Sequence, residues 1–187
     1  MLAEDIQSLL LGKGVDMASF GVGKADTFEQ LVHEVRSEQR RLGLEDGILM
    51  AWTRPVCVTV QSPDGSQYLL ARKQIIAGTG AEVGVRPGIF PAKKTPFDVP
   101  DLDALHACMK KELGMDPSDY TVLSGPDKVV KAGKIYESYP QFPTVYFQEF
   151  WEVRIHESAF NPNGYVEVSH QGNQTKFVWD SHRPTPP

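Results

Sequence analysis

The sequence predicts the α+β class, with a mixed β-sheet flanked by helices in an α/β/α sandwich. Three observations predict it. The chain has 187 residues, 41% of them hydrophobic and 23% charged, so it can form a domain with its own core. Apolar residues recur at helical spacing in some segments and alternate at strand spacing in others. These segments follow in the order helices, hairpin, loop, helix and several strands, which is typical of helices packed on a sheet.

The first 47 residues are expected to be helical. A short helix from Glu4 to Leu11 ends at Gly12, and Asp26 or Thr27 caps a second helix. The second helix has an apolar stripe that comprises Phe28, Leu31, Val32, Val35 and Leu42. Its charged residues are expected to face solvent: Glu34, Arg36, Glu38, Arg40 and Arg41. The pattern therefore predicts a helix whose apolar face packs against another element of the structure.

Beyond these helices the apolar period changes to two. Val56, Val58 and Val60 alternate with polar neighbours, which predicts a half-buried strand. Pro63–Ser66 supplies a turn, and residues 67–76 form the returning strand. Further strands are predicted at residues 120–123, 129–136, 144–155, 165–170 and 176–179.

A long loop with several Gly and Pro residues separates the hairpin from the next helix. Asp101 or Asp103 caps this helix, and Gly114 ends it. Its buried face is expected to comprise Leu102, Leu105, Met109 and Leu113. We therefore divide the chain into a helical segment, a main domain and a loose tail, at residues 1–47, 48–180 and 181–187.

Charge and cysteine content narrow the partners. A net charge of −5 and a pI near 5.5 argue against general nucleic-acid binding. Between Arg72 and Lys134, however, 10 basic and 8 acidic residues give a net charge of +2, which favours an anion site in this section. Cys57 and Cys108 make neither a disulfide framework nor a zinc quartet, as is typical of a reducing compartment. With no apolar run of membrane-spanning length, we expect a cytoplasmic chain without a membrane partner.

The order of elements around the second half of the chain resembles the Nudix fold. A hairpin, a Pro-Gly loop, an amphipathic helix and strands follow one another from Ile48 to Trp179, and the helix ends in Ala107-Cys-Met-Lys-Lys-Glu-Leu-Gly-Met115. The family's box is Gly, five residues, Glu, seven residues, then Arg-Glu-(apolar)-X-Glu-Glu-X-Gly-(apolar). Four positions fit this box: Met109, Glu112, Gly114 and Met115. Four depart from it, so the box is degenerate: Val99 for the early Glu, Ala107 for Arg, and Cys108 and Lys111 for Glu.

The resemblance implies what these departures change. In the family, clustered carboxylates hold a divalent metal ion against a diphosphate and activate water. Lys111 places a cation where the metal ion needs an anion, which leaves Glu112 as a metal ligand on the helix. An active site would need Mg or Mn and further oxygens, for which the candidates are Asp98, Asp101, Asp103 and Glu149. Without such activity no cofactor is required.

Glu149 lies in the middle of a predicted apolar strand face, between Phe147 and Trp151. A carboxylate among apolar neighbours costs several kcal/mol unless it is paired or hydrogen-bonded. Glu149 is therefore a candidate base, metal ligand or ligand contact. A buried ion pair with an Arg or Lys, or a bulge that turns the side chain outward, is the structural alternative.

The remaining candidates are ligand contacts beside the cleft that the resemblance implies. Four basic residues are predicted to bind phosphate oxygens: Arg72, Arg86, Lys93 and Lys94. Two aromatic residues are predicted to contact the ligand, for example by stacking on a base: Phe90 and Phe142. Solvated surface charge and a packed aromatic loop are the structural alternatives for these two groups.

The sequence thus predicts a catalytically degenerate Nudix-like domain. We expect it to bind a nucleotide or another phosphate-bearing small molecule, to serve as a protein-interaction scaffold, or both. A protein docked on the first two helices, or a second copy of the chain, is the expected macromolecular partner. One alternative is an active divalent-metal-dependent pyrophosphohydrolase of an ADP-ribose-like substrate, with Glu112 and Glu149 as its catalytic residues. The other is a purely structural subunit of a larger assembly.

Overall fold

The computed structural model describes the whole chain except residues 24, 86–89, 170–171 and 185–187, and it also leaves out the side chains of residues 132 and 140. The helices are α1 (Ala3–Gly12), α2 (Phe28–Arg36) and α3 (Asp101–Leu113). The strands are β1 (Arg40–Glu45), β2 (Ile48–Gln61), β3 (Tyr68–Ile75), β4 (Glu82–Gly84), β5 (Ala92–Thr95), β6 (Tyr120–Tyr136), β7 (Tyr139–Ile155), β8 (Tyr165–Val168) and β9 (Gln174–Asp180). Short 3₁₀ helices cover Met17–Ser19, Pro117–Asp119 and Glu157–Ala159.

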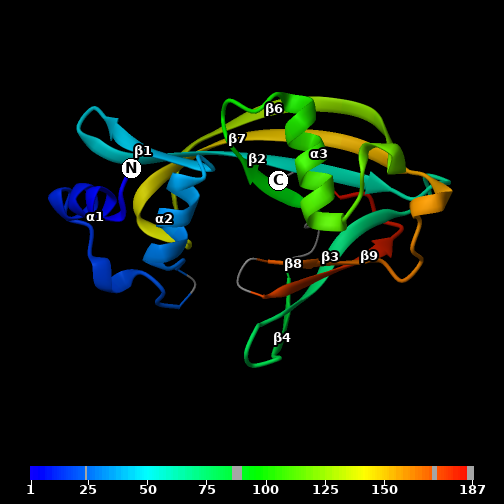
Figure 1. Ribbon diagram of the computed structural model, residues 1–187, viewed down its shortest axis with the longest axis horizontal. Coiled ribbons are helices and arrows are strands. Elements are labelled where there is room, and N and C mark those ends of the chain that lie inside the picture. The colour runs from blue at the N-terminus through cyan, green and yellow to red at the C-terminus, as the bar shows by residue number, and fades with distance from the viewer. Residues whose placement is uncertain (24, 86–89, 170–171, 185–187) are drawn as a thin grey trace. The chain divides into compact units, whose positions relative to one another are not determined.

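The strands form one mixed sheet. Its order is β6-β7-β2-β3-β9-β8, with β1 and β5 paired to β2 and β4 paired to β3. β2 pairs antiparallel with β3, β3 with β9, and β9 with β8. The neighbours β2 and β7 run in the same direction (Figure 1), which makes the sheet mixed. Helices flank this sheet, so the prediction of the α+β class is confirmed.

The chain forms two compact units. Unit 1 comprises Met1–Pro55, Lys94–Val99 and Lys128–Gln148, and unit 2 comprises Val56–Lys93, Pro100–Asp127 and Glu149–Pro187. The core of unit 1 is a cluster of Ile6, Leu10, Val15, Leu31, Val32, Leu49, Ala51, Tyr139 and Phe142. Buried residues of unit 2 include Val56, Val58, Val60, Leu69, Leu105, Cys108, Met109, Val153, Ile155 and Phe177.

The predicted second helix is wrong in its C-terminal half. α2 ends at Arg36, and Arg40–Glu45 forms β1 instead. The reason is a two-residue turn, Asp46–Gly47, which joins β1 to β2 with Glu45 opposite Ile48. Both turn residues have positive φ, 52° and 79°, as a type I′ hairpin turn requires. Pairing with β2 therefore outweighs the helical spacing that continues to Leu42.

α3 closely matches the helix that the sequence predicts before Gly114. Gly114 ends it in the left-handed conformation with φ 73°, as the C-terminal glycine rule predicts. Pro100 is its N-cap, so the prediction of Asp101 or Asp103 as the cap is wrong. Both residues lie in the first turn, where the helix dipole stabilises their negative charge. Leu102 is 48% exposed and does not belong to the buried face, to which Ala104 and Cys108 contribute instead.

The hairpin of β2 and β3 and strands within residues 120–180 are confirmed, but the predicted strands 120–123 and 129–136 are one continuous strand, β6. The expectation that the strand of Val56–Val60 is half-buried is wrong, because Cys57 and Gln61 on its other face are also buried. In the described part of the chain, no helix combines the length and the apolar character needed to cross a membrane.

Candidate ligand site

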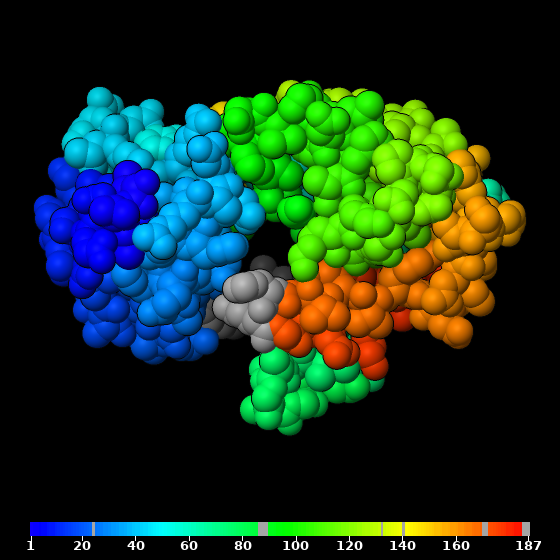
Figure 2. All heavy atoms as spheres, in the orientation of Figure 1, coloured from blue at the N-terminus to red at the C-terminus, as the bar shows by residue number. Residues whose placement is uncertain are grey.

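The candidate site lies in unit 2, where the end of α3 packs against β8. Figure 2 shows these two segments in contact on one face of the molecule, α3 in green and β8 in orange. α3 contributes Lys111 and Glu112, β8 contributes Glu167, and β5 contributes Lys93. We call these four residues the α3–β8 site. It contains two ammonium and two carboxyl groups from three separate elements.

Lys111 is fixed by β8. Its Nζ donates a hydrogen bond of 2.8 Å to the carbonyl oxygen of Val168, and lies 3.8 Å from Oε1 of Glu167. The Glu167 side chain is only 11% exposed, so this cation compensates a carboxylate that is largely removed from water. Lys111 therefore lies beside a carboxylate of β8 whose charge it offsets.

Glu112 has a raised pKa of about 7. Burial is the largest cause, because it disfavours the charged form, and the negative charge of Glu167 adds to it. Lys111 and Lys93 act in the opposite direction but do not restore the ordinary value. With this raised pKa the Glu112 carboxyl takes up a proton more readily than an ordinary glutamate, and in its protonated form it can donate as well as accept a hydrogen bond.

The α3–β8 site has two ammonium groups beside its two carboxyl groups, unlike the all-oxygen ligand sets that Mg²⁺ prefers. Among the residues described, no three His, Cys, Asp or Glu side chains are grouped so that they could hold a metal ion. The assignment of Glu112 as a metal ligand stays a prediction.

Glu149 is buried on β7 in unit 2, with 3% of its surface exposed. Burial among apolar neighbours was the feature predicted from the sequence, and Trp151, Val153 and Ile155 on the same strand are buried as well. The outward turn by a bulge is therefore wrong. The role of Glu149 as base, metal ligand or ligand contact stays a prediction.

The predicted phosphate-binding cations do not share one partner. Arg72 is paired with Asp180 in unit 2, and Lys94 with Glu34 in unit 1. Lys93 lies near enough to Glu112 for its charge to lower the pKa of that carboxyl. Arg86 lies outside the described residues. Two of these side chains thus have carboxylate partners within the fold, and Lys93 is the one that belongs to the α3–β8 site.

Both aromatic candidates are packed inside their units. The ring of Phe90 meets that of Phe150 edge to face, with 6.1 Å between the centroids. Phe142 stacks on Tyr139 at 5.7 Å in the core of unit 1. These contacts are those of core residues, and a role in ligand binding stays a prediction for both.

Sequence reasoning missed a buried ion cluster in unit 1. The carboxylate of Glu34 accepts a 2.7 Å hydrogen bond from Nε of Arg40 and pairs with Lys94. Burial alone would raise the pKa of Glu34, but the charges of Lys94 and Arg40 outweigh it and hold the pKa below its usual value. The guanidinium of Arg40 also lies over the ring of Tyr139, 4.3 Å from its centroid.

The expectation that Glu34 and Arg40 face solvent is therefore wrong, since their exposed fractions are 2% and 1%. A signal was present in the sequence. Glu34 follows Leu31 by three residues, so the two share a helix face, and Leu31 is fully buried.

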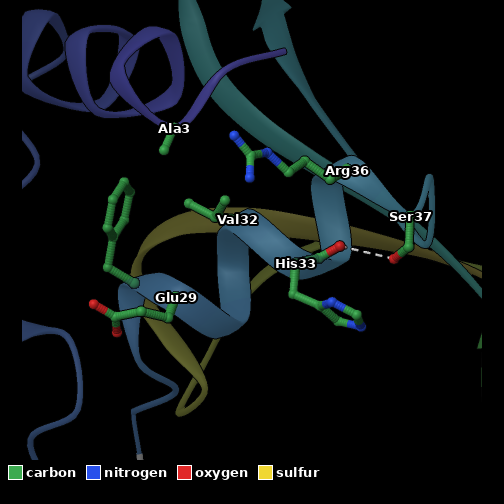
Figure 3. A pocket seen from close by; sticks show the side chains of 7 residues that line it. Ala3, Glu29, Val32, His33, Arg36 and Ser37 are labelled. Carbon is green, nitrogen blue, oxygen red and sulfur yellow. Dashed lines mark hydrogen bonds between the residues drawn. The ribbon is translucent and has the colours of Figure 1, made fainter.

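A second missed feature is an open pocket of about 630 Å³ on α2 in unit 1. Phe28, Val32 and Arg36 lie at every fourth position and so form one row along the helix. Figure 3 shows Val32 and the guanidinium of Arg36 on the side of α2 that faces Ala3 of α1, and Glu29 and His33 also line the pocket. The apolar stripe of α2 was predicted, but the cation at its end was not.

Comparisons with known proteins do not establish a family. No family model and no curated protein sequence matches the chain. Among solved structures, a C. elegans Ap4A hydrolase binary complex has 14% identity and a TM-score of 0.40, with 67% of this chain and 77% of that chain covered. A second C. elegans Ap4A hydrolase structure has 12% identity and a TM-score of 0.37, with the same coverage.

The MutT of Aliivibrio salmonicida and Vibrio cholerae has 15% identity and a TM-score of 0.30, with 68% of this chain and 79% of that chain covered. These neighbours are Nudix hydrolases. All three TM-scores lie below 0.5, and we base no conclusion about this chain on them.

Proposed function

We propose that the chain binds a nucleotide or another phosphate-bearing small molecule at the α3–β8 site and does not hydrolyse it. The observation that carries this proposal is the pair of lysines, Lys93 and Lys111, beside the partly buried carboxyl of Glu112. Lysine ammonium groups bind phosphate oxygens as point charges.

The charges of the four groups favour an anion. Lys93 and Lys111 bring two ammonium groups, and Glu112 and Glu167 bring two carboxyl groups. Because the pKa of Glu112 is raised to about 7, its carboxyl offsets the ammonium groups less than an ordinary glutamate would. A protonated Glu112 would add a hydrogen bond donor toward a phosphate oxygen.

The position of Lys111 supports binding over metal-dependent hydrolysis. Its ammonium group occupies the side of α3 where the Nudix resemblance implies a metal-binding carboxylate, and it is held there by Val168 and Glu167. Direct contact of cationic side chains with phosphate is therefore better supported than contact through a metal ion. The protein-interaction role stays a prediction.

Titration of the full chain with ADP-ribose and with ADP in EDTA tests the proposal. We expect a rise in melting temperature and saturable binding by calorimetry. Lys93→Glu should weaken binding about tenfold to a hundredfold, as loss of a charge-assisted hydrogen bond does. Lys110→Glu is the control charge reversal, because Lys110 lies on α3 next to Lys111 but is 59% exposed and paired with Asp116.

Two results would overturn the proposal. One is the absence of any thermal shift with these nucleotides, or an equal loss of affinity in Lys93→Glu and Lys110→Glu. The other is turnover of ADP-ribose that requires Mg²⁺ or Mn²⁺ and is abolished by Glu112→Gln, which would establish the hydrolase alternative instead.

A further inference from the structure

The pocket on α2 has the size and lining of a small-molecule site. Its volume of about 630 Å³ falls within the range of roughly 300–1,000 Å³ found for ligand pockets. Val32 forms its floor and is 9% exposed, while Phe28 and Ala3 are partly buried and pack against the core of unit 1. An apolar group bound here would therefore lie on a surface that the core already supports.

Arg36 gives this apolar pocket a positive end. Its side chain is exposed and belongs to the pocket lining, and Figure 3 shows the guanidinium directed toward the side of Val32 and Ala3. Within the described part of the chain, Arg36 makes no ion pair or hydrogen bond through this group. By contrast, Arg40 and Arg72 have carboxylate partners in the fold.

Glu29 also lines the pocket, at the other end from Arg36. It lies seven residues before Arg36, which is about two helical turns, so the two residues are on the same side of α2 and roughly 10 Å apart along the axis. At that separation Glu29 forms no direct ion pair with the guanidinium. A ligand whose charged group lies at the Arg36 end of the pocket therefore meets the guanidinium and not Glu29.

We propose that this pocket binds a small carboxylic acid with an aromatic or branched apolar body. The carboxylate lies on the guanidinium of Arg36, whose planar fork matches two carboxylate oxygens. The apolar body lies against Phe28, Val32 and Ala3. This site is independent of the proposed phosphate site, because all its residues belong to unit 1.

The test is an NMR titration of the full, ¹⁵N-labelled chain with 4-phenylbutyrate. We expect saturable shifts of the amides of α2 and of the start of α1. Two comparison ligands separate the contributions: 4-phenylbutanol lacks the charge, and acetate lacks the apolar body. Each should bind at least about tenfold more weakly, because each lacks one of the two contacts.

Substitutions then locate the site. Arg36→Gln should weaken 4-phenylbutyrate binding about tenfold to a hundredfold. Arg36 is exposed, so an unchanged melting temperature is expected to show that this variant folds. Glu29→Gln is the control from the same lining and should not weaken binding, and neither should Lys93→Glu in unit 2.

The proposal is overturned if 4-phenylbutyrate moves no amide of α2, or if 4-phenylbutanol binds as tightly as the acid. It is also overturned if Arg36→Gln leaves the affinity unchanged. None of these results bears on nucleotide binding at the α3–β8 site, so the two proposals fail separately.

Discussion

Two helix carboxylates, Glu34 in unit 1 and Glu112 in unit 2, are both removed from water but have opposite pKa shifts. Burial raises the pKa in both cases. Glu34 has Arg40 and Lys94 as direct ion-pair partners, and their charges bring its pKa below the usual value. Glu112 has Glu167 as a neighbour, so its pKa rises to about 7.

The difference shows that partners, rather than burial, decide what a buried carboxylate does. Glu34 stays ionised and links α2 to β1 and β5 within unit 1, which is a structural role. Glu112 has a pKa near neutrality, and among the described residues it has no ion-pair partner as close as those of Glu34. A bound anion or cation would therefore shift its protonation, whereas Glu34 stays ionised. A helix glutamate thus keeps its charge in unit 1, whereas its charge depends on pH near neutrality in unit 2.

The largest effect is expected from Glu34→Gln. This change leaves the buried cation of Arg40 and the partly buried cation of Lys94 without their carboxylate. Removing one partner of a buried pair costs about 3–5 kcal/mol, and we expect a loss of that size in the free energy of unfolding at pH 7. Urea denaturation followed by circular dichroism measures it. Glu29→Gln, on the exposed part of the same helix, should change stability by less than about 1 kcal/mol.

Acid should reduce the difference in stability between wild type and Glu34→Gln. Since the pKa of Glu34 is lowered from 4.5 on folding, the stability from its charge is present above pH 4.5. It is lost as the pH falls through the lower, folded-state pKa. We therefore expect the stability gap between wild type and Glu34→Gln to narrow steadily below pH 4.5. A gap that stays constant down to pH 2 would contradict the ion-pair account.

Glu112→Gln should change the free energy of unfolding less than Glu34→Gln does, and it should raise it rather than lower it. The pKa of Glu112 rises from 4.5 to about 7 on folding, so its favourable contribution is complete below pH 4.5 and is lost as the pH rises through 7. Gln resembles the neutral acid and has no charge to bury. After discounting for partial exposure, we expect Glu112→Gln to be more stable than wild type by about 1–2 kcal/mol at pH 8.

At pH 4.5 the two proteins should be equally stable, which thermal melts at the two pH values would show. Equal stability at pH 8 would mean that Glu112 is not desolvated.

Part of the fold could be predicted from the sequence, and part could not. Local signals sufficed for α3, whose end follows from Gly114, and for the hairpin of β2 and β3, whose turn follows from Pro63–Ser66. They failed at β1, because helical spacing through Leu42 hid the hairpin signal of Asp46–Gly47. A turn of this kind decides the structure once its two strands pair, and pairing is not visible in one segment.

The ion cluster around Glu34 and the α3–β8 site both depend on partners that are distant in the sequence. Lys94 follows Glu34 by 60 residues, and Val168 follows Lys111 by 57. The sequence predicted a cation on α3 at Lys111, but it did not predict the hydrogen bond of Lys111 to β8. Charge periodicity predicts which residues share a helix face, whereas the strand that covers that face comes from the tertiary fold.

The smallest effect is expected from Lys111→Met, which tests how much Lys111 lowers the pKa of Glu112. The ammonium of Lys111 lowers the pKa of Glu112 and lies 3.8 Å from Glu167, so its removal should move the pKa of Glu112 further above about 7. Because Lys111 is 45% exposed, the stability should fall by no more than about 1 kcal/mol. A ¹³C NMR titration of the Glu112 carboxyl measures the pKa directly. Lys110→Met should leave it unchanged, since Lys110 pairs with Asp116. An unchanged pKa in Lys111→Met would mean that Lys93 alone offsets the burial of Glu112.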